Sequence, residues 1–300
     1  MLPSRIPPFR PYPNRPILHP LKHTRYPHFD RTDRMTIAAG FVCRDGILLC
    51  ADSLYSGQEK AYRDKLYSHI TSGGTALGFA ISGDVDYART AICDCLESVS
   101  EMAHERQQDI LSVKKTIRRA VKRVLRDYGA EKLDQFQKPD ILIGIRAGDV
   151  LQLCSARDSA FPSIDKFECK GSGGYLASYM LSHIRYPEHF TITQILPWVV
   201  RALAAVKVHD TYCGGGSQFL AMRIGQSTGI KSLRIDEIDA IAETFDLSVS
   251  RLFWEMTRRN AEQPFDAALK AFTQTIEELR ENLVSDGSRY RSFEASLEEA

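Results

Sequence analysis

The stretch that decides the fold runs from Thr36 to Asp52 and reads TIAAGFVCRDGILLCAD. Two apolar runs, 36–43 and 47–52, flank a short Arg-Asp-Gly segment. An Asp-Gly pair between two apolar runs is typical of a β-hairpin, because glycine adopts the positive φ angles of tight hairpin turns. The sequence therefore predicts two paired strands, with Thr36 at the start of the first and Asp52 at the end of the second.

The pattern continues along the chain as a second hairpin and then a helix. Apolar runs over 65–70 and 75–82 flank the turn Thr-Ser-Gly-Gly, so two more strands are predicted there. Gly83 and Asp84 end the second of these strands. Since an aspartate carboxylate accepts hydrogen bonds from the exposed N–H groups of a helix start, Asp84 is expected to cap the helix that follows.

Helices and strands alternate in blocks along the rest of the chain. The patterns predict helices over 85–104, 108–128, 175–184 and 191–207, and strands over 140–146, 149–155, 217–223 and 229–235. Strands, a helix pair, strands, a helix pair and strands follow one another in this order, which is not a βαβ repeat. The order predicts an α+β protein with sheets and helices in separate layers.

Both ends of the chain differ from this middle part. Residues 1–35 hold eight of the 13 prolines and carry a formal charge of +5, which leaves −4 on the rest. Proline at this density blocks helices and sheet ladders, so the segment is predicted to be a disordered extension. It is either a propeptide or the product of a mis-assigned start, and Met35 is the favoured true initiator. The domain is expected over 36–235, followed by a helical C-terminal extension over 236–300.

Composition excludes several classes of function. The 300 residues carry 39 Lys and Arg against 38 Asp and Glu, and no apolar run reaches the ~20 residues that a membrane helix needs. The seven cysteines are odd in number, and Cys93 and Cys95 lack the second pair of a zinc site. We therefore expect a reduced, cytoplasmic protein with no metal, no cofactor and no membrane contact.

Two segments raise the question of nucleic-acid binding. The predicted 108–128 helix carries seven Lys and Arg around its apolar stripe, and 241–252 has a helix-turn-helix pattern. No aromatic or glycine-rich motif accompanies the first segment, and acidic residues surround the second. A solvated charged face is the favoured interpretation of the helix, and no nucleic-acid partner is predicted.

The chemistry begins with Thr36 as a mature N-terminus, where one residue carries both a hydroxyl and a free α-amine. An α-amine has a pKa of about 7.7–8.0, so near pH 7 a useful fraction is neutral and can take the hydroxyl proton. A neighbouring cation lowers that pKa, and Lys65 is the candidate. Asp52 is the carboxylate expected to hold the lysine, and Gly83, at a strand-to-helix turn, is the candidate donor to an oxyanion.

At these residues the chain resembles a known family. The stretch Thr36–Ser53 looks like the start of a proteasome β-type subunit or of its bacterial HslV-like relatives, with the aspartate 16 residues after the threonine. Ile81-Ser-Gly-Asp84 resembles the loop of that family that carries the oxyanion glycine. Gly171-Ser-Gly-Gly174 and Asp210-Thr-Tyr-Cys-Gly-Gly215 resemble its GSG and D-x-x-S-G-G elements. Together these anchors cover about 36–235.

The resemblance implies an N-terminal nucleophile (Ntn) hydrolase fold, which is a four-layer αββα sandwich with two antiparallel sheets. Carried over residue by residue, it assigns Thr36 as nucleophile and base, Asp52 and Lys65 as its tuning pair, Gly83 as oxyanion donor, and Ser172, Asp210 and Cys213 as supports of the amine. Cys213 stands where the family has serine. Because a thiol is a weaker hydrogen-bond partner than a hydroxyl, this support network is expected to be looser.

Two functions are compatible with the resemblance. The first is a threonine-type peptidase that hydrolyses peptide bonds in protein degradation, as a homo-oligomeric ring fed by an ATP-driven unfoldase. The alternative is a non-catalytic scaffold subunit of a ring assembly. The scaffold subunits of the family carry an extra N-terminal helix, which the proline-rich residues 1–34 cannot form. The peptidase is therefore the favoured function.

Overall fold

The structure is a computed structural model, and the residues it describes all belong to the unit that runs from Asp33 to Ala300. The described residues are 36–56, 60–102, 109–127, 139–157, 160–182, 190–224, 230–235, 244, 247–254 and 262–285. The predicted extension over 1–35 lies outside them, as does part of the 241–252 segment.

The first sheet contains the hairpin from which the fold was predicted. Its five strands lie in the order β10-β1-β2-β11-β12, and every neighbouring pair is antiparallel. The strands are β1 (Ala38–Cys43), β2 (Gly46–Asp52), β10 (Phe167–Lys170), β11 (Ser217–Arg223) and β12 (Ile230–Ile235). In the register of the hairpin, Ala38 pairs with Ala51, so Thr36 and Asp52 lie at the same end of the sheet.

The second sheet also has five antiparallel strands, in the order β5-β6-β7-β8-β9. The strands are β5 (Leu66–Ile70), β6 (Ala76–Ser82), β7 (Asp140–Ala147), β8 (Val150–Ala156) and β9 (Ser163–Ile164). A separate small hairpin, β3 (Leu54–Ser56) and β4 (Lys60–Tyr62), connects the end of the first sheet to the start of the second along the chain.

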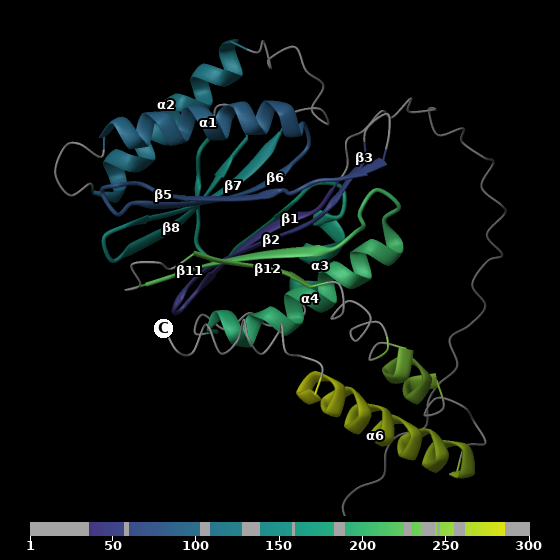
Figure 1. The fold of residues 1–300 in the computed structure, drawn as a ribbon. Coiled ribbons are helices and arrows are strands. Elements are labelled where there is room, and N and C mark those ends of the chain that lie inside the picture. The colour runs from purple at the N-terminus through teal and green to yellow at the C-terminus, as the bar shows by residue number, and fades with distance from the viewer. Residues whose placement is uncertain are drawn as a thin grey trace, which may run out of the picture. The chain divides into compact units, whose positions relative to one another are not determined.

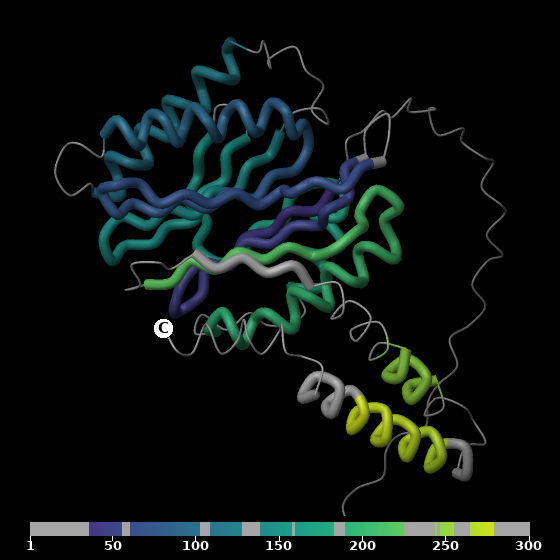
Figure 2. Tube along the Cα trace, in the orientation of Figure 1, coloured from purple at the N-terminus to yellow at the C-terminus, as the bar shows by residue number. Residues whose placement is uncertain are grey.

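Two pairs of helices cover the outer faces of the sheets (Figure 1). The pair α1 (Val85–Met102) and α2 (Ile110–Asp127) packs on the second sheet, and the pair α3 (Gly174–Ser182) and α4 (Ile192–His209) packs on the first. The backbone trace in Figure 2 follows the same arrangement. These four layers confirm the predicted αββα sandwich of α+β class.

Alternating side chains explain why β1 and β2 are apolar at nearly every position. On β1, Ala39 and Phe41 face α3 and α4, whereas Ala38 belongs to the core between the two sheets. On β2, Leu48 faces α3 and α4, whereas Leu49 belongs to the core between the two sheets. Because successive side chains of a strand point to opposite faces, a sheet covered on both sides needs apolar residues at nearly every position.

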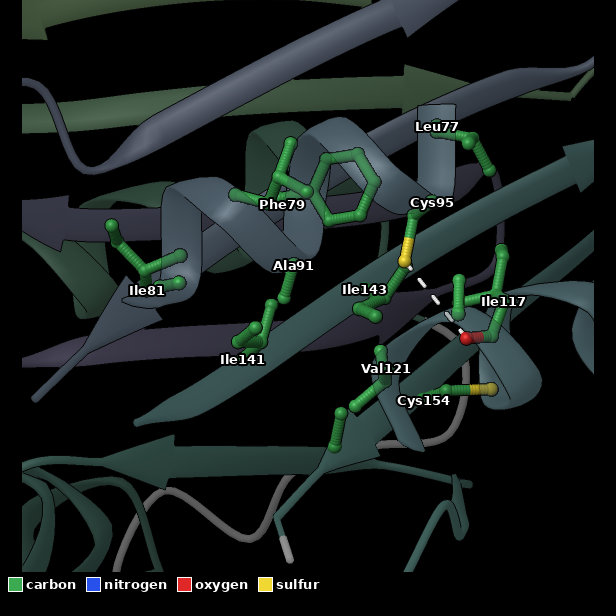
Figure 3. Packing of buried hydrophobic residues seen from close by; sticks show 14 of the residues in the cluster. Leu77, Phe79, Ile81, Ala91, Cys95, Ile117, Val121, Ile141, Ile143 and Cys154 are labelled. Carbon is green, nitrogen blue, oxygen red and sulfur yellow. Dashed lines mark hydrogen bonds between the residues drawn. The ribbon is translucent and has the colours of Figure 1, made fainter. Parts of the chain in front are cut away.

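The core between the second sheet and its helices consists of aliphatic and aromatic side chains and thiols. Figure 3 shows Phe79 and Ile81 of β6 with Ala91 of α1, Val121 of α2 and neighbouring residues. At its centre the buried Cys95 thiol lies 3.9 Å from the carbonyl oxygen of Ile117 on the other helix. Burial raises the pKa of this thiol to about 12, so it stays protonated.

The predicted helices and strands of the sandwich are all present, with ends within two residues of those expected. Asp84 caps α1 as predicted, since its Oδ1 accepts from the N–H groups of Asp86 at 3.0 Å and Tyr87 at 3.1 Å. The sequence analysis did not include β3, β4, β9 and β10. These strands have two to four residues each, which is too short for a periodic pattern.

Part of the predicted helical C-terminal extension lies among the described residues. Residues 247–254 are helical, and α6 spans Glu262–Ser285. Within the part of the chain that the structure describes, no helix is both long enough and apolar enough to cross a bilayer.

Candidate active site

Thr36 lies directly before β1 and is held by the end of β2. The backbone N–H of Ile37 donates to Oδ1 of Asp52 at 3.2 Å, and the backbone N–H of Asp52 donates to the carbonyl oxygen of Ile37 at 3.2 Å. This exchange continues the hairpin ladder by one step beyond β1. The Asp-Gly turn fixes the register of the hairpin, so it also fixes which carboxylate lies beside the threonine.

The hydroxyl of Thr36 lies between a carboxylate and an ammonium group. It donates to Oδ1 of Asp52 and accepts from Nζ of Lys65, and Lys65 Nζ lies 2.5 Å from the same carboxylate oxygen. The exposed fractions of Thr36, Asp52 and Lys65 are 3%, 0% and 1%. The structure therefore brings together three of the residues predicted from the sequence, although they are up to 29 positions apart.

The charges in this cluster are matched and their hydrogen bonds are satisfied. The ammonium of Lys65 has three N–H donors, and its three acceptors are Thr36 Oγ1, Asp52 Oδ1 and the carbonyl oxygen of Leu54. The other oxygen of Asp52 accepts from the backbone N–H of Gly214 at 2.9 Å. Burial lowers the pKa of Lys65, and the charge of Asp52 opposes that shift. The lysine is a cation that one carboxylate holds in place.

Glycines allow the backbone to approach Thr36 closely. A Cβ added to Gly171, whose φ is +86°, would lie 1.9 Å from the carbonyl oxygen of Thr36 and 3.4 Å from Cβ of Ser82. Position 171 is therefore restricted to glycine by both space and conformation. Ser82 is the last residue of β6, so its approach to Gly171 places the end of β6 beside Thr36. Gly83 is the next residue of the chain and has a φ of +83°.

The remaining predicted residues form a second group at the start of α3 and the end of α4. The Cys213 thiol lies 3.4 Å from Oδ2 of Asp210 and 3.8 Å from Oγ of Ser172. Burial and the carboxylates of Asp52 and Asp210 raise the pKa of the thiol, so it is a protonated donor. A Cβ on Gly173 would lie 2.8 Å from its sulfur and 3.3 Å from Cβ of Ile37, next to Thr36.

Gln218 on β11 is a residue of this region that the sequence analysis missed. Its side chain accepts from the backbone N–H of Lys65 at 3.0 Å and donates to Oδ1 of Asp64 at 2.6 Å. The signal available in the sequence was weak, because it consists of one amide within the run Ser-Gln-Phe-Leu-Ala-Met.

The predicted absence of a metal stays a prediction. Among the described residues, no group of three or more His, Cys, Asp or Glu side chains is arranged to hold a metal ion. All seven cysteines are free thiols.

Comparison with known proteins gives the family. The profile of the family described as Proteasome subunit matches residues 33–221. Among curated protein sequences, none matches the chain. The sandwich and the family match define the class as the proteasome-type Ntn-hydrolase fold. The chain belongs to the proteasome subunit family.

Solved structures support the same fold at low sequence identity. Anbu from Hyphomicrobium sp. strain MC1 is 13% identical with a TM-score of 0.62, covering 75% of this chain and 99% of that one. Anbu from Yersinia bercovieri, described as an ancestral beta-subunit, is 12% identical with a TM-score of 0.62, covering 73% and 97%. The helical assembly of the Anbu complex from Pseudomonas aeruginosa is 14% identical with a TM-score of 0.62, covering 76% and 100%.

Proposed function

We propose that the protein is a threonine-type peptidase and that Thr36, once it is the N-terminal residue, is its nucleophile. One observation carries the proposal: the Thr36 hydroxyl is buried between the Asp52 carboxylate and the Lys65 ammonium. A threonine with only a structural role in a strand needs neither charge. Burying a matched ion pair around one hydroxyl is costly, which favours a chemical role for that hydroxyl.

The proposed reaction starts with a proton transfer from the Thr36 hydroxyl to its own neutral α-amine. Oγ1 then attacks the carbonyl carbon of the scissile peptide bond, and the oxyanion that forms accepts from the backbone N–H of Gly83. The α-ammonium returns its proton to the leaving amine, the C–N bond breaks, and an ester remains on Thr36. Water, deprotonated by the same amine, hydrolyses this ester and releases the new carboxyl end.

Lys65 acts here as a fixed cation. Its charge lowers the pKa of the nearby α-amine and stabilises negative charge on Oγ1 during attack. Asp52 holds the lysine, and the proposed supports of the amine are Ser172, Asp210 and Cys213, which are hydrogen-bonded to one another.

The mechanism requires a free α-amine on Thr36, which Met35 precedes in the sequence. We propose that Met35 is the true initiator and is removed during normal processing, because threonine is small enough to permit that removal. Self-cleavage of a propeptide over 1–35 is the competing route to the same end.

The proposed working form is a homo-oligomeric ring in the cytoplasm, fed by an ATP-driven unfoldase as the HslV-like resemblance implies. The Anbu complex from Pseudomonas aeruginosa forms a helical assembly, which supports assembly of identical subunits in this fold. The seven free thiols support a reducing compartment.

Protein expressed from Met35 tests the proposal. Intact mass should show Thr36 as the first residue, and the protein should hydrolyse peptide amides. Thr36→Ala should abolish turnover and leave the fold intact, whereas Thr71→Ala, a buried threonine in the β5–β6 turn, should retain it. No turnover by protein with a free Thr36, alone and with an unfoldase, would leave the scaffold function. Equal turnover by Thr36→Ala would remove Thr36 as the nucleophile.

A further inference from the structure

The side chain of Gln218 bridges the two sheets next to the candidate active site. Gln218 lies on β11 opposite Ala51, one position from the pair of Ser217 and Asp52. Its side chain is 6% exposed and reaches the segment before β5, which starts the second sheet. A buried amide in a strand of apolar residues requires partners for both of its ends.

One end of the amide holds the backbone of Lys65. The lysine lies one residue before β5, and its backbone N–H donates to a side chain of the first sheet. Gln218 Oε1 accepts from that N–H at 3.0 Å, while the carbonyl oxygen of Lys65 accepts from the backbone N–H of Ile81 at 3.0 Å. The first sheet therefore fixes one side of the lysine's peptide backbone, and the second sheet fixes the other.

The other end of the amide is fixed by Asp64. Nε2 of Gln218 donates to Asp64 Oδ1 at 2.6 Å. A carboxylate accepts hydrogen bonds and does not donate, so it fixes the NH₂ end of the amide on its own side. The oxygen must then face the N–H of Lys65, because the opposite orientation would place two donors against each other.

We propose that Gln218 is a positioning residue that sets the distance between the Lys65 ammonium and Thr36. The inference rests on the proposed function of Thr36 and adds a residue outside the ion pair. It acts through the side-chain carboxylate of Asp64 and the backbone N–H of Lys65, which are the described contacts of its amide.

Replacement of the amide by an isosteric apolar side chain tests the inference. Gln218→Met removes both hydrogen bonds of the amide and should lower kcat for peptide amides by about tenfold, with KM within about twofold. The acidic limb of the kcat/KM profile should move to higher pH, because a displaced Lys65 no longer lowers the pKa of the Thr36 amine. Gln152→Met is the matched control, since that amide bonds Ser163 on the second sheet. It should leave both parameters unchanged.

A reversed hydrogen bond provides the rescue. Gln218→Glu alone places two carboxylates together and should be at least as impaired as Gln218→Met. When Gln218→Glu is combined with Asp64→Asn, the introduced amide donates to one oxygen of the introduced carboxylate, and the other oxygen of that carboxylate accepts from the Lys65 N–H. Activity and the pH profile should recover toward those of the parent protein. If Gln218 has only a structural role, Gln218→Met leaves the kcat/KM pH profile unshifted, and the double variant has no shift to reverse.

A measurement that needs no turnover separates this inference from the proposed function. NMR of protein labelled at lysine Cε follows the titration of Lys65, and amide hydrogen exchange follows its N–H. In Gln218→Met the titration should shift and the N–H should exchange faster, whether or not the parent protein is a peptidase. An unchanged titration and unchanged exchange would overturn the inference. If the parent protein hydrolyses no peptide but the Lys65 titration shifts in Gln218→Met, only the proposed peptidase function is overturned.

Discussion

The two sheets of the sandwich differ in what they bury. The core of the second sheet against α1 and α2 contains aliphatic, aromatic and thiol side chains, as Figure 3 shows. The first sheet has a similar apolar core against α3 and α4, but at one end it also buries Asp52, Ser217 and Gln218. The strands of the second sheet bury Ser82, Arg146 and Ser155, and Lys65 and Gly83 lie just outside the ends of β5 and β6.

The charged groups of the candidate site lie at strand ends and outside the apolar cores that pack against the helices. The carboxylate and the hydroxyl come with the first sheet, and the cation comes from the chain segment that enters the second. The ion pair therefore forms only where the two sheets meet at one end. Substitutions on the two sides should have different effects, and three comparisons test this.

The largest effect is expected from Lys65→Met. It removes the cation and leaves Asp52 buried without a counter-charge, so it should lower the free energy of unfolding by about 3–5 kcal/mol. The rate of amide hydrolysis should fall about 100-fold or more. Denaturant unfolding and peptide turnover measure the two effects.

The double variant Asp52→Asn with Lys65→Met is the control for that experiment. It removes both charges, so it should recover much of the stability and none of the activity. Equal instability of the single and double variants would show that the buried charge is not the cause.

An intermediate effect is expected from Gly171→Ala, and Gly74→Ala is its counterpart in the second sheet. Both glycines have positive φ, +86° and +81°, but a Cβ at Gly74 meets nothing within 4 Å. Gly74→Ala should therefore cost only the conformational strain, about 1 kcal/mol. Gly171→Ala should cost about 2–4 kcal/mol and lower turnover, because its Cβ displaces the carbonyl of Thr36. Equal costs at the two positions would mean that the contact with Thr36 relaxes freely.

The smallest effect is expected from exchanging thiols for hydroxyls. Cys213→Ser should raise turnover by a factor below about ten, because a hydroxyl is the stronger partner for Asp210 and Ser172. Cys95→Ser, in the core of the second sheet, should lower stability by about 1–2 kcal/mol without changing turnover per folded molecule. A drop in turnover for Cys213→Ser would show that the sulfur itself is required there.

Long apolar strands and amphipathic helices produce patterns from which the strands and helices could be predicted, and the family resemblance implied the four-layer sandwich. The Asp-Gly turn placed Thr36 and Asp52 at the same end of a hairpin. The position of β10 beside β1 was not predictable from periodicity, since its few residues pair with a strand that is distant in the sequence, as in the pair Ala38 and Lys170.

Only part of the candidate site could be predicted from the sequence, and the kind of contact that each residue makes separates the predicted residues from the missed one. Thr36 and Asp52 lie in a family motif, and Lys65 was predicted because an N-terminal amine needs a nearby cation. Gln218 contacts a backbone N–H and the exposed Asp64, and neither contact has a signature in the local sequence.

The bridge from β11 to Lys65 joins residues 153 positions apart. A chain that is still being synthesised and has not reached residue 218 has the nucleophile, the carboxylate and the lysine, but not the amide that fixes the lysine's backbone. The site of a peptidase built in this way is completed late, when nearly the whole sandwich has emerged from the ribosome. The last strands of the sandwich must therefore fold before the backbone N–H of Lys65 has its partner from the first sheet.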